Sequence, residues 1–470
     1  MHVSRSEVGT YGSVIKRIAG FALVLVGGLL IAAFVMNADV YYILAVSAAV
    51  ALGLILARNL QRGLAAYFFF AALAFGMSPA VHSPHSGYES GVMPSEVFLA
   101  FLTILWLGRA VFNKELRIVK SDLNLPLFAL VAVSCVSLVA NNVFRGTREL
   151  LFHQMLITQV AEVGLLCLSV CAYFLAANNL HEEWWLRLIQ VPVVLLALYF
   201  SVHRIFDVEL PVPVYWGSFL LAAGIGIVYA HLLFSRLNRC TVILLSTLLA
   251  VLLYAAYNNL SWVSGWIAIS GVIMVVSFLK SKWLAGVLFV IALLAIFVWP
   301  GIYQTVHDES EGGGDFDRFV IWQDAFRMFM SVNPVLGVGP GNYHPYVYYH
   351  NTIWFGGRTY TTAHSNYVQM ASELGLVGLI VFLWVIIAGV RTGLKAWQAC
   401  PADFRWLAAA ATAVFASMAV TSVFGDYLFP SRGNNGIVNF GTTVYTWLLI
   451  GAAVACTNLY SRTSDHQGQG

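Results

Sequence analysis

Uncharged apolar stretches of about 17 to 25 residues recur from one end of the 470-residue chain to the other. Each stretch is long enough to cross the hydrocarbon core of a bilayer, about 30 Å, as an α-helix. A segment inside lipid must satisfy its own backbone hydrogen bonds, which an α-helix does. The sequence therefore predicts an all-α integral membrane protein, a polytopic bundle of about 12 to 14 transmembrane helices with one large outer loop.

Composition excludes a soluble globular protein. The chain is 60% hydrophobic and only 10% charged, whereas soluble domains carry about 25% charged residues. We expect spans to begin near residues 18, 40, 63, 94, 125, 159, 188, 214, 241, 262, 284, 373, 406 and 441.

The basic residues indicate the orientation of these spans. Lys and Arg are enriched in cytoplasmic loops, and an inward N-terminus places all but seven of the 25 Lys and Arg on that side. The seven outer residues are all arginines: Arg145, Arg148, Arg204, Arg318, Arg327, Arg358 and Arg432. Because the planar guanidinium suits phosphate oxygens, this pattern suggests an anionic ligand on the outer side.

One loop of about seventy residues is far longer than a typical connection. It divides the chain into an N-terminal transmembrane bundle (1–300), an outer loop with short helices (301–372), C-terminal transmembrane helices (373–460) and a cytoplasmic tail (461–470). Long ordered loops on a rigid scaffold often carry function.

The first half of this loop predicts a surface helix. Asp315 and Asp317 could hold a divalent cation or cap the next helix, and we favour the cap and expect no metal site. Residues 318–330 place an aromatic stripe on one helical face, which either lies on the membrane surface or packs on the bundle. Its members are Phe319, Trp322, Phe326, Phe329 and Met330.

The second half combines glycines, tyrosines and a histidine. Residues 337–341 predict a tight turn, because no strand precedes the glycines and no Lys-Ser/Thr pair follows them. The aromatic residues after the turn suit either sugar stacking or the membrane interface. We expect Thr361 or Thr362 to cap a helix whose first turn presents His364, a proton carrier near neutral pH.

The stretches RFVIWQDAF, NPVLGVGPGNY and AHSNYVQMASELGLVGL, within residues 318–385, resemble the O-antigen ligase and Wzy-type O-antigen polymerase family of GT-C-like membrane glycan transferases. The resemblance implies a bacterial inner-membrane, multi-pass protein whose active site faces the periplasm. It implies a donor glycan on undecaprenyl diphosphate, a lipid- or glycan-linked acceptor, and neither metal nor other cofactor. Lipid bilayer is the remaining expected partner, and no nucleic acid is expected.

By position, the resemblance implies that His364 assists the acceptor hydroxyl and that Arg318 neutralises the diphosphate. Members of the family commonly carry another arginine where this chain has Val263 and Ser264. A second diphosphate contact must then come from another outer arginine, with Arg204 preferred over Arg145 and Arg148. Candidate sugar or acceptor contacts are Tyr343, Tyr349, Trp354, Arg358, Asn366 and Tyr367.

The resemblance implies that the loop 301–372 is periplasmic and catalytic, and that the protein is an O-antigen ligase-like glycosyltransferase. Transfer would be to an acceptor hydroxyl of lipid A core or a similar acceptor, with inversion and without a metal. A Wzy-type repeat-unit polymerase and a protein O-oligosaccharyltransferase remain alternatives, since they differ mainly in the acceptor. A lipid or polysaccharide transporter is the alternative from another class, for which ionisable residues within spans are typical. Glu162 is the clearest such residue, whereas His and Arg cluster in the outer loop.

Overall fold

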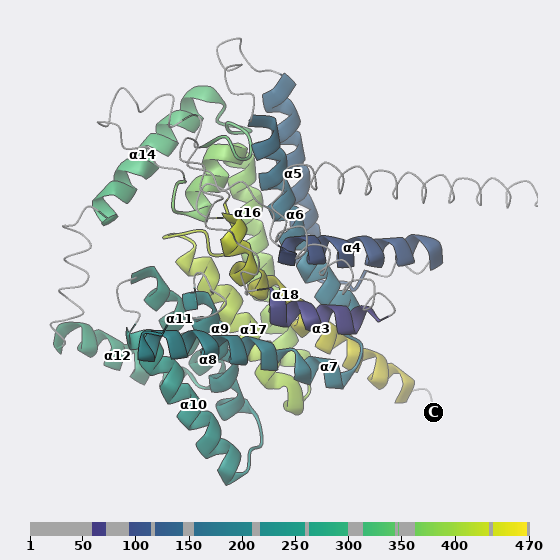
Figure 1. Ribbon diagram of the computed structural model, residues 1–470, viewed down its shortest axis with the longest axis vertical. Coiled ribbons are helices and arrows are strands. Elements are labelled where there is room, and N and C mark those ends of the chain that lie inside the picture. Colours follow the sequence, from purple (N-terminus) through teal and green to yellow (C-terminus); the bar gives the residue numbers. More distant parts are fainter. Residues whose placement is uncertain are drawn as a thin grey trace, which may run out of the picture.

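The computed structural model describes residues 59–71, 94–113, 118–143, 155–208, 217–258, 263–298, 314–343, 346, 362–431 and 436–467. This part of the chain is helical, and no strand occurs in it (Figure 1). Its α-helices are α3 (Leu60–Phe70), α4 (Pro94–Asn113), α5 (Asn124–Val143), α6 (Met155–Asn179), α7 (Glu183–Leu188), α8 (Gln190–Phe206), α9 (Gly217–Phe234), α10 (Arg239–Asn258), α11 (Val263–Lys280), α12 (Lys282–Val298), α14 (Gly314–Val332), α16 (Asn366–Ala399), α17 (Arg405–Thr421) and α18 (Gly436–Gln467).

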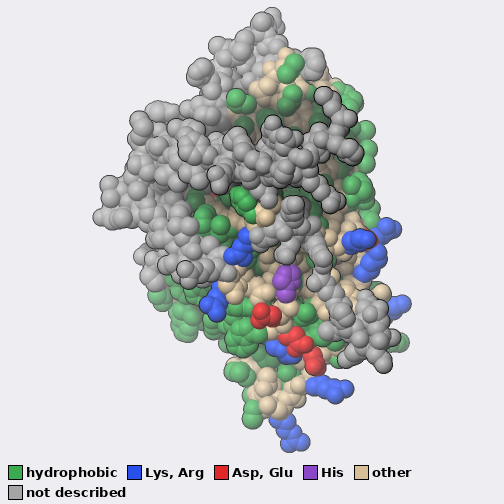
Figure 2. All heavy atoms as spheres, turned by 90° about the vertical axis from the view of Figure 1, so that its right-hand side faces the viewer, with side chains coloured by type: hydrophobic (Ala, Val, Ile, Leu, Met, Phe, Trp, Pro, Cys, Tyr) green, Lys and Arg blue, Asp and Glu red, His purple; other side chains and the backbone are tan. Residues whose placement is uncertain are grey.

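Eight helical segments among the described residues are long and apolar enough to cross a membrane, and Ser264–Lys280 and Lys282–Leu294 are shorter apolar helices. The all-α polytopic membrane fold is therefore confirmed. The spans expected near residues 18 and 40 lie outside the described residues. On the face drawn in Figure 2, basic and acidic side chains gather in the lower half.

The centre of the bundle is formed by α17 and α18. In the apolar stretches of these helices, 83% and 94% of the residues are buried. In α10 only 11% of the residues of the apolar stretch are buried, so its apolar side chains suit contact with lipid. α18 packs along α6, while α17 packs between α11 and α16. Small residues allow these close approaches; a Cβ on Gly271 of α11, for example, would lie 2.3 Å from the Ser417 hydroxyl of α17.

α16 is broken at Gly375, whose φ of 69° and ψ of −168° are not helical. The segment 334–339 runs beside the break and satisfies the backbone groups that the break frees. Val338 and Gly339 donate to the carbonyls of Ser372 and Glu373, each at 2.9 Å, and the Leu376 N–H donates to the Pro334 carbonyl at 2.9 Å. Irregular backbone is tolerated inside a membrane protein where protein groups complete its hydrogen bonds in this way.

Helix α14, which belongs to the long loop, packs on this segment through a small core of its own. Ile321, Ala325 and Met328 of α14 are buried with Val338, Tyr343, Tyr346 and Ala363. Phe319, Phe326 and Met330 point away from the core and are 68%, 58% and 51% exposed. The expected aromatic stripe is thus divided, because Phe329 is buried while these three side chains form an exposed apolar face.

Candidate functional site

His364 lies directly before α16, in a left-handed backbone conformation with φ of 47°. Its N–H donates to the Thr362 hydroxyl at 3.2 Å. Ser365 caps the helix by accepting from the Val368 N–H at 3.4 Å. The expectation that Thr361 or Thr362 caps the helix and that His364 lies in its first turn is therefore wrong. A non-glycine residue with positive φ stores strain and persists only where its surroundings hold it.

Arg318 of α14 lies within electrostatic reach of His364. Burial, and to a smaller extent the positive charge of Arg318, together lower the pKa of His364 from 6.5 to about 4. The imidazole is therefore neutral at neutral pH. The structure thus brings together the two residues that the sequence predicts as the centre of the site.

The connection between α17 and α18 forms another wall of the site. Burial raises the pKa of Tyr427 to about 12, and this hydroxyl too lies in the field of Arg318. It contacts the Ser264 hydroxyl at 2.6 Å. Ser264, one of the two positions at which the resemblance implies an arginine in other members of the family, therefore contacts the candidate site through Tyr427.

Asp426 and Tyr427 are site residues that the sequence analysis missed. Asp426 accepts from the Thr362 hydroxyl and from the Asn366 amide, both at 3.4 Å. The sequence feature that could have indicated them is an acidic and a phenolic side chain in FGDYLFP, between two apolar spans. Because these residues are far from His364 in sequence, their position near it could not be predicted.

Asn366 fixes that connection to the start of α16. Its side-chain oxygen accepts from the N–H groups of Leu428 and Phe429 at 2.9 and 3.2 Å, and its amide donates to the Phe429 carbonyl at 2.7 Å. Its backbone N–H donates to the Ser422 carbonyl at 2.9 Å. The side chain is 1% exposed, so its polar groups are used inside the protein.

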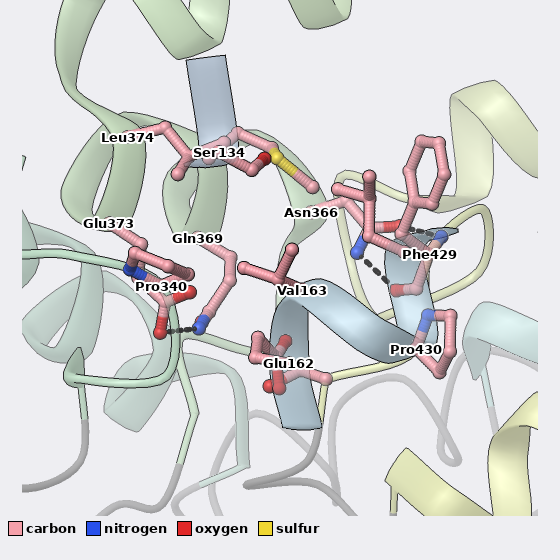
Figure 3. A pocket seen from close by; sticks show the side chains of 13 residues that line it. Ser134, Glu162, Val163, Pro340, Asn366, Gln369, Glu373, Leu374, Phe429 and Pro430 are labelled. Carbon is pink, nitrogen blue, oxygen red and sulfur yellow. Dashed lines mark hydrogen bonds between the residues drawn. The ribbon is translucent and has the colours of Figure 1, made fainter. Parts of the chain in front are cut away.

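A small cavity lies beneath these residues, between α6 and α16 (Figure 3). Its volume of about 20 Å³ has room for about one water molecule. Glu162 of α6 and the Gln369 and Glu373 side chains of α16 point into the same space. Gln369 donates to the Glu373 carboxyl at 2.5 Å.

The remaining predicted residues are more dispersed. Arg204 is exposed at the end of α8, where its guanidinium lies 5.4 Å from the ring centre of Phe200, and among the described residues it adds no contact to the cluster around His364. Tyr343 is 1% exposed, and the Tyr367 hydroxyl donates to the Ala419 carbonyl at 2.9 Å. Outside the described residues lie Arg145, Arg148, Tyr349, Trp354 and Arg358.

The fold and the site together define a polytopic helical membrane protein in which a long loop brings a histidine and an arginine to one end of the bundle. The family model for O-antigen ligase matches residues 243–383, from α10 into α16. This match includes Ser264, Arg318 and His364 and confirms the resemblance to the O-antigen ligase and Wzy-type family. No curated protein matches the chain.

Proposed function

We propose that this protein is a glycosyltransferase that moves a glycan from undecaprenyl diphosphate to an acceptor hydroxyl. The observation that carries the proposal is the neutral, partly buried His364 that lies within electrostatic reach of Arg318, in a segment that resembles O-antigen ligase. The reaction would take place at the periplasmic face of the bacterial inner membrane. The positive-inside bias of the sequence supports this orientation.

His364 is the general base in this proposal. A sugar hydroxyl is a weak nucleophile, and a positioned base is worth about 10² to 10⁴ in rate. In the free protein, the lowered pKa keeps the imidazole neutral and able to accept a proton. When an anionic diphosphate binds beside Arg318, its charge offsets that of the guanidinium and raises the pKa of His364. The base therefore becomes stronger when the donor is present.

Arg318 stabilises the leaving group. The acceptor oxygen forms a bond to the anomeric carbon of the donor while the bond from that carbon to the diphosphate oxygen breaks. The electron pair leaves with the diphosphate, the acceptor proton passes to His364, and the anomeric configuration inverts. A fixed guanidinium can stabilise the developing charge without a metal ion. Arg204, Arg145 and Arg148 remain candidates for a second diphosphate contact.

The acceptor distinguishes the closest alternatives. A ligase transfers to lipid A core, a Wzy-type polymerase to a second lipid-linked glycan, and a protein O-oligosaccharyltransferase to a polypeptide. Tyr343, Tyr349, Trp354, Arg358, Asn366 and Tyr367 remain the proposed sugar or acceptor contacts. For the transporter alternative, Glu162 lines the cavity of about 20 Å³ described above, which is too small for a glycan to pass.

The test is transfer from a synthetic undecaprenyl diphosphate oligosaccharide by the purified protein in EDTA. Lipid A core, a second donor molecule and an acceptor peptide are offered separately. We expect wild type to elongate one acceptor and His364→Ala and Arg318→Ala to lose activity, whereas the exposed control variants His181→Ala and Arg236→Ala keep it. Failure of wild type with every acceptor, or full activity of His364→Ala, would overturn the proposal.

A further inference from the structure

Glu373 is a buried carboxyl side chain in α16, two residues before the break at Gly375, and is 4% exposed. Its Oε1 atom accepts from the Tyr343 N–H at 3.3 Å and from Gln369 Nε2 at 2.5 Å. The carboxyl thus joins the glycine-rich segment 337–343 to the first turns of α16. This contact comes in addition to the backbone bonds that already hold the segment at the break.

Gln369 continues this connection toward the site. Its Oε1 atom accepts from the Ala363 N–H at 3.3 Å, which leaves its amide nitrogen to donate to Glu373. The Ala363 carbonyl in turn accepts from the Trp322 indole at 2.9 Å. Both backbone polar groups of the residue before His364 are therefore fixed by side chains, and Gln369 and Glu373 form one arm of that support (Figure 3).

The backbone at His364 needs such support because its φ is positive. Without external contacts, a non-glycine residue relaxes toward negative φ, and the side chain then points elsewhere. A shift of about 1 Å in a reacting group can reduce the rate by about 10²-fold. Support at Ala363, the residue directly before His364, can therefore control the direction of the imidazole.

We propose that Glu373 is a positioning residue that fixes His364 through Gln369 and Ala363. The inference rests on the proposed function only in using His364 as the reacting base. Glu373 acts as a hydrogen-bond acceptor in this role, and it donates no proton to substrate. Glu162, which faces the same cavity from α6, suggests the competing role of a pair of carboxyl groups that carry a proton.

Substitution by glutamine separates the two roles. Glu373→Gln keeps an acceptor oxygen for Tyr343 and Gln369 but cannot ionise, whereas Glu373→Ala removes the acceptor. We expect Glu373→Gln to keep kcat within about threefold of wild type and Glu373→Ala to lose about 10²-fold in kcat with little change in the donor KM. Equal losses in both variants would overturn the positioning role, and so would full activity of Glu373→Ala.

Gln369→Ala tests the path to His364. This variant breaks the same chain of hydrogen bonds at the residue nearer to His364. The loss of kcat in the double variant Gln369→Ala/Glu373→Ala should therefore be no larger than in either single variant. Additive losses would contradict a shared path. Ser137→Ala is the matched structural control, because Ser137 donates to the backbone carbonyls of Leu336 and Glu373, at 2.8 and 3.2 Å, without contacting the carboxyl. It should reduce thermal stability and leave kcat nearly unchanged.

A readout without glycan transfer separates this inference from the proposed function. Diethyl pyrocarbonate modifies neutral, accessible histidines, and mass spectrometry reports the rate at His364. We expect Glu373→Ala to change this rate at least severalfold at pH 7, while Glu373→Gln and Ser137→Ala match wild type. An unchanged rate in Glu373→Ala would overturn the positioning role even if transfer is active. A changed rate in a protein that is inert with every acceptor would support the positioning role and overturn only the transferase proposal.

Discussion

Trp322 donates its indole N–H to the Ala363 carbonyl, 2.9 Å away, and so ties the helix that carries Arg318 to the residue before His364. The two residues are 41 positions apart in sequence. The bond acts together with the small core that buries Ile321 and Ala325 of α14 with Ala363. The relative placement of the predicted base and the predicted diphosphate contact therefore depends in part on a side chain that itself carries no charge.

Trp322→Phe keeps an aromatic ring, although a smaller one, and removes this hydrogen bond. Loss of a partly buried hydrogen bond costs about 1 kcal/mol, and we expect kcat for glycan transfer to fall about fivefold to tenfold because α14 and His364 are less firmly aligned. The exposed Trp184 of α7 provides the control, and Trp184→Phe should match wild type. Identical kinetics for the two variants would show that the tie does not align the site.

The pKa of His364 predicts the pH dependence. Since this pKa is lowered to about 4 by burial and by Arg318, kcat/KM should stay flat down to about pH 5 and then fall with a midpoint near 4. The midpoint for kcat should lie higher, because bound diphosphate offsets Arg318. In Arg318→Gln, which is expected to be inactive, the pKa of His364 should move upward, as measured by the pH dependence of its modification by diethyl pyrocarbonate. Arg327→Gln is the control, since Arg327 is exposed and pairs with Asp324 at 3.7 Å.

The lowered pKa of His364 also makes the stability of the folded protein depend on pH. The pKa of His364 in the folded protein lies below its usual value of 6.5, so the unfolded chain binds the proton more tightly. The contribution of neutral His364 is fully present above pH 6.5 and is lost as pH falls from 6.5 toward 4. The apparent Tm of His364→Gln should therefore fall less than that of wild type between these pH values. A parallel decline of both proteins would contradict the assigned pKa.

Asn366 allows a structural role to be separated from a role in sugar binding. Asn366→Ala removes the acceptor for the Leu428 and Phe429 N–H groups, which are buried. An unsatisfied buried group costs about 1–3 kcal/mol, so we expect a lower Tm and a loosened connection between α17 and α18. Thermal unfolding in detergent measures the change in Tm. A raised KM for the acceptor with an unchanged Tm would instead assign Asn366 to sugar binding.

The helices could be predicted from the sequence because lipid imposes one rule on every span. An apolar stretch of sufficient length forms a helix whatever its partners. The span starts expected near residues 125, 159 and 241 therefore lie close to the first residues of α5, α6 and α10. Arg318 and His364 followed from the resemblance of the outer loop to a known family. In these cases local sequence carries the information.

The missed features depend on contacts between distant segments. The sequence predicts a membrane span that begins near residue 373, whereas the long apolar segment of α16 begins at Asn366. Polar side chains of its first turns, such as Asn366 and Gln369, are buried against other parts of the protein. The break at Gly375 is stable only because segment 334–339 completes its hydrogen bonds. No periodicity reports such a pairing. The Glu-Leu-Gly run inside an apolar stretch was the local sign that the helix is interrupted there.

Gly375→Ala tests this interruption. A Cβ on Gly375 would lie 2.2 Å from the Val335 carbonyl oxygen, and φ of 69° is itself unfavourable for alanine. We expect a loss of about 3 kcal/mol or more in the free energy of unfolding. Gly286→Ala is the matched control in α12, where a Cβ would meet nothing within 4 Å. That variant should be unchanged or more stable by up to about 1 kcal/mol, since alanine favours a helix interior. Equal stability of the two variants would show that the backbone at Gly375 relaxes to a normal helix.

The exposed face of α14 predicts contact between the outer loop and lipid. Phe319, Phe326 and Met330 are spaced along one side of the helix and point away from its protein-facing core, which is the arrangement of a helix lying at a membrane interface. A photoactivatable phenylalanine analogue at position 326 should therefore crosslink to acyl chains in proteoliposomes. Gln323 is also exposed but is polar, and the analogue at position 323 should crosslink to lipid much less. Equal labelling at the two positions, or none at position 326, would mean that α14 stands clear of the bilayer. A positive result would place Arg318 at the depth where the diphosphate of a membrane-anchored donor lies, because the same helix carries both the lipid-facing side chains and the arginine.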